Sequence, residues 1–389
     1  HYHQGSQVPD IRSIRDAATE ACRIYVELVR EGAAMGLLDI GGGLGIDYDG
    51  SRTNSQSSRN YGIEEYAADV IDVTKSVCDE SKVSHPTIIS ESGRAISAYY
   101  SVLIFNVLDV NSPSSDTSIE DLPGDLHSHI VKLSEVEMYL SEESIQECYN
   151  DALYYRGELL SLFHHGSISL RARAQCNSIF NRVMKKIYMM AESMDSAPDE
   201  ILNNTNAPDV YYGNFSVFQS LPDAWAINQL FPVMPIHRLD EEPTSKAILA
   251  DITCDCDGRL DNFIVDGEHE HYLPLHSLKE NEDYYIGVFL VGAYQETLGD
   301  LHNLLGDTNV VSVGMKDGMV QYLRELAGDT IFVVLSYVEY DPKNLIERFR
   351  RLAERSVEDG KITPVQRREI IDSFRESIDG YTYFESHNT

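Results

Sequence analysis

A short apolar strand that runs directly into glycine-rich backbone is the feature of this sequence that most constrains its fold. Residues 37–40 are apolar apart from Asp39 and lead into the loop Gly41-Gly42-Gly43-Leu44-Gly45. Glycine after a strand lets backbone N–H groups come close to a phosphate, and a following helix terminus favours the same anion. The loop lacks the G-x-G-x-x-G frame and a following G-K-[ST], so neither a dinucleotide fold nor a P-loop is predicted. A tight turn without a ligand is the alternative.

The first hundred residues alternate between helical and strand patterns. Apolar residues recur at helical spacing over 21–29 and again over 66–78, and Pro86 precedes an apolar strand at 87–89. This order is typical of a parallel α/β fold, in which chemistry collects at the carboxyl ends of strands. Two strand–helix units cannot close an eight-stranded barrel, so any barrel here would begin upstream of His1.

Four further segments follow, each with its own pattern. They are a strand at 99–114 that opens a β-domain, a helical insertion at 115–205, a β-domain of sandwich or barrel type at 206–313, and a helical region at 314–389. The helical patterns are clearest at 141–163, 169–194, 342–357 and 364–378. The predicted fold class is therefore α/β plus β, with added helices.

Charge and hydropathy exclude two classes of partner. The chain has 63 Asp and Glu against 31 Lys and Arg, a formal net charge of −32. Nucleic acids and anionic membranes bind basic patches, so we predict neither as a partner. No apolar run approaches the roughly 20 residues of a membrane helix. We interpret the excess of acidic residues as a contribution to solubility. The alternative interpretation is that these residues attract cationic small molecules.

The cysteines and the N-terminus bear on the compartment. Six cysteines in 389 residues are too few for the disulfide framework of a small secreted protein. The low cysteine content therefore predicts a reducing cellular compartment. Cys254 and Cys256 form C-x-C, unlike the C-x-x-C of structural zinc. His269 and His271 could complete a metal site, but we predict no metal ligand set from this spacing. No targeting peptide is visible at His1, which predicts an internal start, from a fragment or from processing.

A carboxylate and a guanidinium follow the second strand, in Glu91-Ser92-Gly93-Arg94. Arg94 could hold a phosphate through two parallel hydrogen bonds. Glu91 could keep a pyridine ring protonated, as pyridoxal phosphate requires when it acts as an electron sink. Alone, an ion pair on a loop is the simpler interpretation. Near the start of the chain, His3 could stack on a flat ring and Ser6 could donate to a phosphate.

Two downstream segments also carry reactive groups. In Cys254-Asp255-Cys256-Asp257, a thiol beside carboxylates could return a proton to a carbon that has lost CO2, and an acidic neighbour could hold a cationic substrate. Tyr294 offers a hydroxyl after an apolar run. An inert cysteine near a turn and a half-buried strand tyrosine are the alternatives.

In their order along the chain, these motifs resemble the fold-type III, alanine racemase-like pyridoxal phosphate decarboxylases, which include ornithine and diaminopimelate decarboxylases. The motifs are H-x-G-S at 3–6, D-I-G-G-G at 39–43, E-x-G-R at 91–94, C-D at 254–255 and G-A-Y at 292–294. Longer strings at 39–50, 216–220, 293–296 and 301–304 resemble the biosynthetic arginine decarboxylases of that family. The resemblance covers nearly the whole chain and implies that residues 1–98 are the C-terminal part of a cofactor-binding, TIM-like (β/α)8 barrel.

The resemblance implies pyridoxal 5′-phosphate as the cofactor and a role for each matching residue. Cys254 would return the proton, contributed across a dimer interface, with Asp255 or Asp257 near the substrate and Asp223 at its distal end. Family members often require Mg²⁺, for which we predict no ligands. The residues implied in cofactor binding are His3, Ser6, Gly41, Gly42, Gly43, Glu91, Gly93, Arg94 and Tyr294.

The activity implied is that of a lyase, which converts L-arginine to agmatine and CO2 for putrescine and spermidine biosynthesis. The resemblance also implies a dimer or higher oligomer in the cytoplasm, or in the plastid of a plant or alga. Two alternatives stay open. One is a non-catalytic, regulatory homologue, and the other is a decarboxylase of another basic amino acid.

The family's Schiff-base lysine has no counterpart in this sequence. The resemblance places that lysine upstream of the His3 motif, whereas Lys75 falls in a helical pattern and Lys82 in the loop after it. We therefore expect activity to need an N-terminal segment, either in an uncut precursor or as a second polypeptide, and we expect the chain to be inactive alone.

Overall fold

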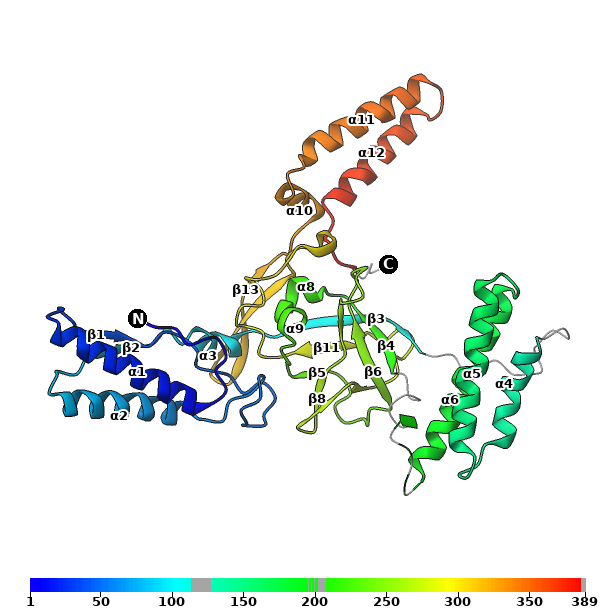
Figure 1. The fold of residues 1–389 in the computed structure, drawn as a ribbon. Coiled ribbons are helices and arrows are strands. Elements are labelled where there is room, and N and C mark those ends of the chain that lie inside the picture. The colour runs from blue at the N-terminus through cyan, green and yellow to red at the C-terminus, as the bar shows by residue number, and fades with distance from the viewer. Residues whose placement is uncertain (113–126, 195, 197, 199, 202–207, 386–389) are drawn as a thin grey trace. The chain divides into compact units, whose positions relative to one another are not determined.

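The computed structural model describes residues 1–112, 127–194, 196, 198, 200–201 and 208–385. The chain divides into two compact units (Figure 1). The first comprises residues 1–109, 211–244 and 248–389, and the second comprises residues 110–210 and 245–247. None of the helices in the described ranges is both long and apolar enough to cross a membrane.

The first unit begins with a parallel α/β layer. Its two strands pair in parallel, its two helices pack side by side, and Val8 forms a parallel bridge with Leu44 (Figure 1). The Asp10 side chain caps the first helix by accepting from the Arg12 N–H. The elements are α1 (Ile11–Arg30), β1 (Leu37–Asp39), α2 (Ile63–Ser81) and β2 (Thr87–Ile89).

The core of this layer forms between one face of each helix and β1. Helix α1 buries Ala18, Cys22 and Tyr25, whereas Ile24 and Leu28, which belong to the apolar pattern over 21–29, are exposed. Two apolar stripes run along α1, and only one of them can face β1. The helix was predicted correctly, but part of its apolar pattern does not belong to the core.

The next part of the chain contains a sheet of short strands, in which the pairs β3–β11, β11–β5 and β6–β7 are antiparallel. The sheet has the order β10-β6-β4-β3-β11-β5, with β7 paired to β6. Rings of Phe105 and Phe215 stack at 4.1 Å in its core. The strands are β3 (Leu103–Asn111), β4 (Asp209–Gly213), β5 (Val233–Pro235), β6 (Ser245–Ala250), β7 (Arg259–Leu260), β10 (Leu273–Leu275) and β11 (Tyr285–Val288).

Several short elements connect this sheet and carry residues of the candidate site. Strands β8 and β9 form a small hairpin, and the remaining elements are single helical turns. They are α3 (Gly93–Ser97), η1 (Ala98–Tyr100), α8 (Val217–Ser220), α9 (Pro222–Ile227), β8 (Phe263–Val265), β9 (Glu268–Glu270) and η3 (His302–Leu304).

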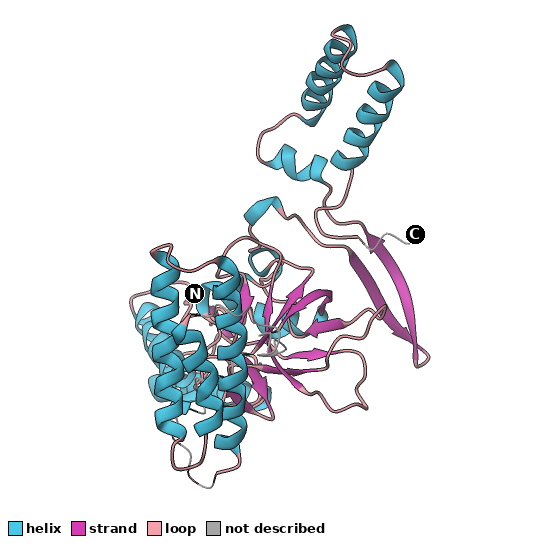
Figure 2. Ribbon diagram, turned by 90° about the vertical axis from the view of Figure 1, so that its right-hand side faces the viewer, coloured by secondary structure: helices cyan, strands magenta, loops and turns pink. Residues whose placement is uncertain are grey.

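The second unit contains a bundle of three helices that pack against one another (Figure 2). Helices α5 and α6 lie where the patterns at 141–163 and 169–194 predicted them, and α4 was not predicted. Its core contains Leu133, Ile179 and Val183. Residues 115–126 of the predicted insertion, and several residues after 194, lie outside the described ranges. The helices are α4 (Ser128–Tyr139), α5 (Ile145–His164) and α6 (Leu170–Glu192).

The C-terminal part of the first unit begins with an antiparallel hairpin. Its second strand, β13, lies inside the region 314–389 that the sequence predicted as helical. Asp317 and Gly318 both have positive φ and form the turn, a hairpin signal that the prediction overlooked. The helices at 342–357 and 364–378 lie where predicted. The elements are β12 (Val310–Lys316), β13 (Met319–Leu326), α10 (Ile331–Tyr337), α11 (Pro342–Glu358) and α12 (Pro364–Ile378).

Candidate active site

Arg94 lies at the centre of the candidate site, in the short helix α3 that follows β2. Its side chain is only 7% exposed. One guanidinium nitrogen donates to the Tyr48 hydroxyl at 2.8 Å, and another donates to Ser6 Oγ at 3.2 Å and lies 3.8 Å from Asp223 Oδ2. A buried guanidinium requires such partners, because an unpaired buried charge is strongly destabilising. The fold thus joins Ser6 and Arg94, which are 88 positions apart.

Tyr294 and Asp223 complete this group. The centroid of the Tyr294 ring lies 4.8 Å from the Arg94 guanidinium carbon. The backbone of Tyr294 has a positive φ of 70°. The Gln295 amide donates to Asp223 Oδ2 at 2.8 Å and accepts from the Asp223 N–H at 3.1 Å. Four of the residues singled out in the sequence, Ser6, Arg94, Asp223 and Tyr294, therefore converge from four separate segments.

The surroundings of Arg94 fit a phosphate group. The Nε atom of Arg94 is buried and, within the described part of the chain, has no hydrogen-bond partner. A phosphate oxygen is the acceptor that this donor suits. Across the site, Gly41 has φ of 63°, and a Cβ atom there would overlap the Tyr2 carbonyl oxygen. Only glycine lets the loop pass this closely.

The glycine loop also makes hydrogen bonds within the protein. The Gly41 N–H donates to Asp39 Oδ1 at 2.9 Å, and the Gly42 N–H donates to His3 Nδ1 at 3.3 Å. His3 Nδ1 is therefore the acceptor in this contact. These bonds link the loop to the His3 segment. Phosphate binding by Gly41, Gly42 and Gly43 stays a prediction, as does stacking by His3.

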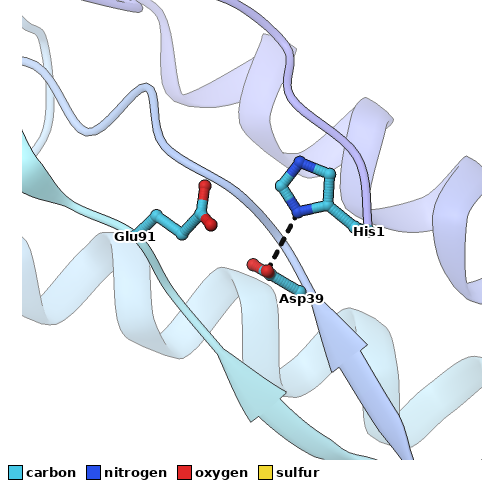
Figure 3. Close-up of side chains that lie close together, drawn as sticks. All are labelled: His1, Asp39 and Glu91. Carbon is cyan, nitrogen blue, oxygen red and sulfur yellow. Dashed lines mark ion pairs between the residues drawn. The ribbon is translucent and has the colours of Figure 1, made fainter.

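Glu91 belongs to a second polar group beside the loop (Figure 3). Its backbone N–H donates to the Gly41 carbonyl oxygen at 2.9 Å, and its exposed side chain lies near Asp39 and His1. His1 Nδ1 lies 2.9 Å from Asp39 Oδ2. These three side chains could share a cation, although exposed acidic groups are common without one. Gly93 begins α3 with open space where a Cβ would lie.

Sequence reasoning missed Tyr48 and Gln295 as partners of this site. Burial raises the pKa of the Tyr48 hydroxyl, and the neighbouring Arg94 only partly offsets this effect. Tyr48 therefore stays protonated and neutral at pH 7. Tyr48 falls within the family-like string 39–50 and Gln295 directly follows the G-A-Y motif, so the longer strings held the available signal.

The segment around Cys254 forms a separate group. Cys254 is exposed, and the Asn303 amide donates to its Sγ atom at 3.2 Å. Asp255 Oδ2 lies 3.6 Å from His302 Nε2, and Asp255 Oδ1 accepts from the Asp257 N–H at 3.0 Å. Across the described ranges, no hydrogen bond or ion pair joins this segment to the residues around Arg94.

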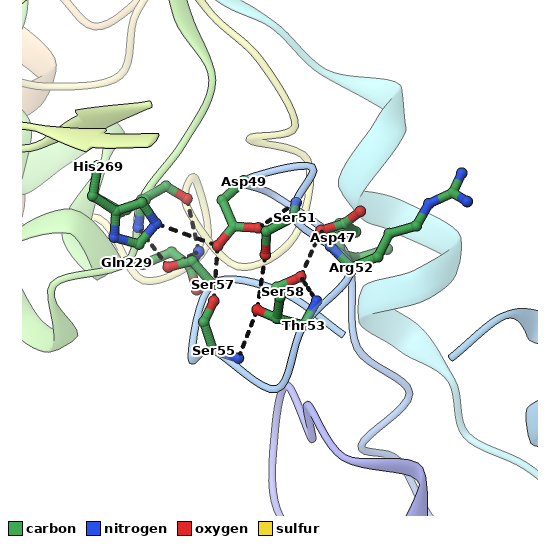
Figure 4. A network of polar contacts seen from close by, with 12 residues as sticks. Asp47, Asp49, Ser51, Arg52, Thr53, Ser55, Ser57, Ser58, Gln229 and His269 are labelled. Carbon is green, nitrogen blue, oxygen red and sulfur yellow. Dashed lines mark hydrogen bonds and ion pairs between the residues drawn. The ribbon is translucent and has the colours of Figure 1, made fainter. Parts of the chain in front are cut away.

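A polar network anchors the loop after the glycines (Figure 4). Asp49 Oδ1 accepts from the Ser51 N–H at 2.9 Å, and Asp49 Oδ2 accepts from Ser55 Oγ at 2.8 Å and lies 3.4 Å from His269 Nε2. Burial alone would raise the pKa of Asp49, but these hydrogen bonds outweigh it and lower the pKa to about 2. Asp49 is therefore a buried anion at neutral pH.

Beside this network is a cavity of about 550 Å³. His269 and Asp257 line it together with Trp225 of α9. His269 faces Asp49, and His271 Nδ1 lies 3.4 Å from the Asp261 carbonyl oxygen. Neither histidine lies in the group of potential ligands that contains Cys256, so the zinc alternative raised by the sequence gains no support from these contacts.

Three family models match the chain. Residues 1–98 match the pyridoxal binding domain of pyridoxal-dependent decarboxylases, residues 123–206 the arginine decarboxylase helical bundle domain, and residues 331–384 the arginine decarboxylase C-terminal helical extension. The biosynthetic arginine decarboxylase of Bacteroides thetaiotaomicron is 45% identical over 387 residues, which cover 99% of this chain and 61% of that protein. Over nearly its whole length, the chain is similar to members of the biosynthetic arginine decarboxylase family.

Other members of this family show the same similarity. The biosynthetic arginine decarboxylase of Thermosynechococcus vestitus is 46% identical, over 99% of this chain and 61% of that protein. The crystal structure of the biosynthetic arginine decarboxylase of Campylobacter jejuni superposes with a TM-score of 0.84 at 30% identity, over 99% of this chain and 63% of that one. The predicted resemblance and the predicted fold class are confirmed, and the match of residues 1–98 to a pyridoxal binding domain supports the predicted cofactor. The chain spans about three fifths of the length of these relatives.

Proposed function

We propose that the protein is an arginine decarboxylase, which converts L-arginine to agmatine and CO2 with pyridoxal 5′-phosphate. One observation carries this proposal. The buried Arg94, with its unpartnered Nε atom, lies between Ser6 and Tyr294 in a chain that is similar to the biosynthetic arginine decarboxylases. A non-catalytic homologue would have no reason to keep Cys254, Glu91 and Arg94 together.

The residues around Arg94 would hold the cofactor. Arg94, Ser6 and Tyr294 would bind its phosphate, His3 would stack on its ring, and Glu91 would keep a proton on its pyridine nitrogen. When bound, the cofactor supplies a cationic ring that accepts the electrons left by CO2. Gly41, Gly42, Gly43 and Gly93 let the backbone come close to the phosphate. The Schiff-base lysine expected upstream of His3 stays a prediction.

Acidic residues would hold the substrate. Asp255 and Asp257 offer carboxylates to the guanidinium of arginine. Asp223 already accepts from Gln295 and lies near Arg94, so it would meet the substrate only at the edge of the cofactor site. A positively charged substrate suits a chain with a formal net charge of −32.

Cys254 would return a proton to the carbon that has lost CO2. No hydrogen bond or ion pair in the described ranges joins Cys254 to the residues around Arg94, and the family resemblance places this cysteine across a dimer interface, so we infer that Cys254 serves the site of a second subunit. The protein would then work as a dimer or a larger oligomer. The product agmatine would feed polyamine biosynthesis in the cytoplasm, or in a plastid if the source is a plant or alga.

The direct test is an assay of CO2 release by the full-length protein with pyridoxal phosphate. We expect release from L-arginine and at least a hundredfold less from ornithine and lysine, because a site that pairs with a guanidinium rejects shorter amines (on the order of 10²-fold or more). Faster release from ornithine or lysine would favour the second candidate, a decarboxylase of another basic amino acid. A complete gene product without a Schiff-base lysine would contradict both.

Replacement of the proton donor tests the role of Cys254. We expect Cys254→Ala in the full-length protein to slow agmatine formation about a hundredfold or more, the usual effect of losing a general acid. Protonation at the wrong position would also convert the cofactor to its amine form, which can be followed by its absorbance. The matched control is Cys256→Ser, which removes the neighbouring exposed thiol. Normal turnover without loss of cofactor in Cys254→Ala would remove Cys254 from this role.

A further inference from the structure

Two consecutive residues of one turn contact two consecutive residues of the Cys254 loop. In the turn η3, the Asn303 amide nitrogen donates to Cys254 Sγ at 3.2 Å, and His302 Nε2 lies 3.6 Å from Asp255 Oδ2. The same Asn303 side chain places its oxygen 3.7 Å from the sulfur. The pairing joins segments 49 positions apart in the sequence.

The turn that carries these residues has an unusual backbone. Asn303 and Leu304 have φ of 56° and 58°, both in the left-handed region. Asparagine tolerates this conformation, whereas leucine adopts it only under backbone strain. The Phe218 ring packs on the His302 ring at 4.2 Å, and the Phe218 carbonyl oxygen accepts from the Asp300 N–H at 3.0 Å. The turn is therefore held in place by neighbouring structure.

Two acidic residues, Asp255 and Asp257, follow Cys254 closely in the sequence. Among the hydrogen bonds found in the described ranges, that from Asn303 is the one donated to this sulfur. A thiol that gives up its proton becomes an anion, and a hydrogen bond donated to an anion stabilises it.

We propose that Asn303 is a positioning residue for Cys254. Its amide oxygen accepts from the S–H group before proton transfer, and its amide nitrogen donates to the sulfur afterwards, so the sulfur keeps one position in both protonation states. His302 holds the adjacent Asp255 and so fixes the loop. The inference rests on the proposed role of Cys254 as the proton donor, and it adds the residue that controls this donor.

The test measures the reactivity of Cys254 directly and does not depend on turnover. In the full-length protein with Cys256→Ser, Cys254 is the one exposed thiol of this chain, because the other four cysteines are buried. Alkylation of Cys254 by iodoacetamide is followed from pH 6 to 10 by mass spectrometry. Asn303→Asp and Asn303→Gly are compared, since both residues tolerate the left-handed backbone.

We expect Asn303→Asp to slow alkylation at neutral pH about tenfold, because the hydrogen-bond donor is replaced by an anion that repels the reactive thiolate. Asn303→Gly should slow it about threefold, since water replaces part of the lost hydrogen bond. The matched control is Asn309→Ala. It removes a side chain that accepts a hydrogen bond from the Gly328 N–H, and within the described ranges no hydrogen bond joins that side chain to Cys254. It should leave the rate unchanged.

An unchanged alkylation profile in both folded variants overturns the proposal, and if Asn303→Asp does not fold, Asn303→Gly decides. Activity gives a second measurement: Asn303→Asp should raise the fraction of turnovers that end in conversion of the cofactor, and Asn309→Ala should not. If alkylation shifts as expected but Cys254→Ala keeps full turnover, the proposed function of Cys254 fails and the Asn303 contact stands. If alkylation does not shift while Cys254→Ala is impaired, the positioning role fails and the function stands.

Discussion

At the scale of single residues, the planar guanidinium of Arg94 explains why arginine occupies this position. It contacts Tyr48 and Ser6 with different nitrogens and keeps Nε free for a ligand. A lysine retains the charge but loses the fixed geometry. We expect Arg94→Lys to weaken pyridoxal phosphate binding about tenfold to a hundredfold, from the loss of one or two charge-assisted hydrogen bonds. Titration of the full-length protein, followed by cofactor absorbance, measures this change.

The control for that substitution is Arg259→Lys. Arg259 is 54% exposed and pairs with Asp261 at 3.0 Å, an arrangement that contributes little. Its replacement should leave cofactor affinity within about twofold of the wild type. Equal affinity in both variants would contradict phosphate binding by Arg94.

Asp49 gives a pH dependence whose direction follows from its lowered pKa. A pKa of about 2 in the folded state lies below the usual value, so the ionised group stabilises the fold above about pH 4, and this contribution is lost as the pH falls toward 2. The contribution is about 2 kcal/mol. We expect Asp49→Asn to lower the free energy of unfolding in urea by about this amount at pH 7 and by much less at pH 2.5. An equal loss at both pH values would show that the charge of Asp49 is not the cause.

The sequence predicted much of the candidate site at this scale. Ser6, Arg94 and Tyr294, each taken from a motif, do lie together, and Glu91 lies beside the glycine loop. Tyr48, Gln295 and Asn303 could not be assigned as partners, because each acts through a contact between distant segments. Spacing along the chain carries no information on such contacts.

At the scale of elements, the glycine loop after β1 depends on a close approach between backbones. A Cβ atom at Gly41 would overlap the Tyr2 carbonyl oxygen. A residue with a side chain would also have to adopt the φ of 63° that Gly41 has. Gly50 has φ of 72° but open space around its Cα. We expect Gly41→Ala to destabilise the protein by about 2–4 kcal/mol and Gly50→Ala by about 1 kcal/mol, since only the first adds a clash to the strain. Urea unfolding of both variants measures the difference, and equal losses would exclude the clash.

The predicted elements differ in how well local pattern determines them. Helices α11 and α12 begin at prolines preceded by capping side chains, Asp341 and Thr363, so their starts are readable from sequence. Strand β13 falls in the region 314–389 that was predicted as helical, and that prediction did not use the Asp317-Gly318 turn. The buried face of α1 depends on which stripe meets β1, and that choice is made by tertiary packing.

At the scale of the whole molecule, the two chemical groups of the site share no hydrogen bond or ion pair within the described part of one chain. Arg94, Ser6 and Tyr294 form one cluster, and Cys254 with Asn303 forms another. The family resemblance assigns Cys254 to the site of a second subunit, and this assignment stays a prediction. Composition and periodicity give no such assignment, because they describe one chain at a time. A complete site would then require two copies in twofold symmetry.

Mixing of inactive variants tests that arrangement. Glu91→Ala removes the proposed partner of the pyridine nitrogen, and Cys254→Ala removes the proton donor. When equal amounts of the two full-length variants exchange subunits at random, about half of the dimers are mixed, and each mixed dimer has one intact site of its two. We therefore expect about a quarter of the wild-type activity, although each variant alone has almost none. If mass spectrometry shows mixed dimers but no activity returns, Cys254 must act within its own chain, and the site would have to close by a movement of the Cys254 loop toward Arg94.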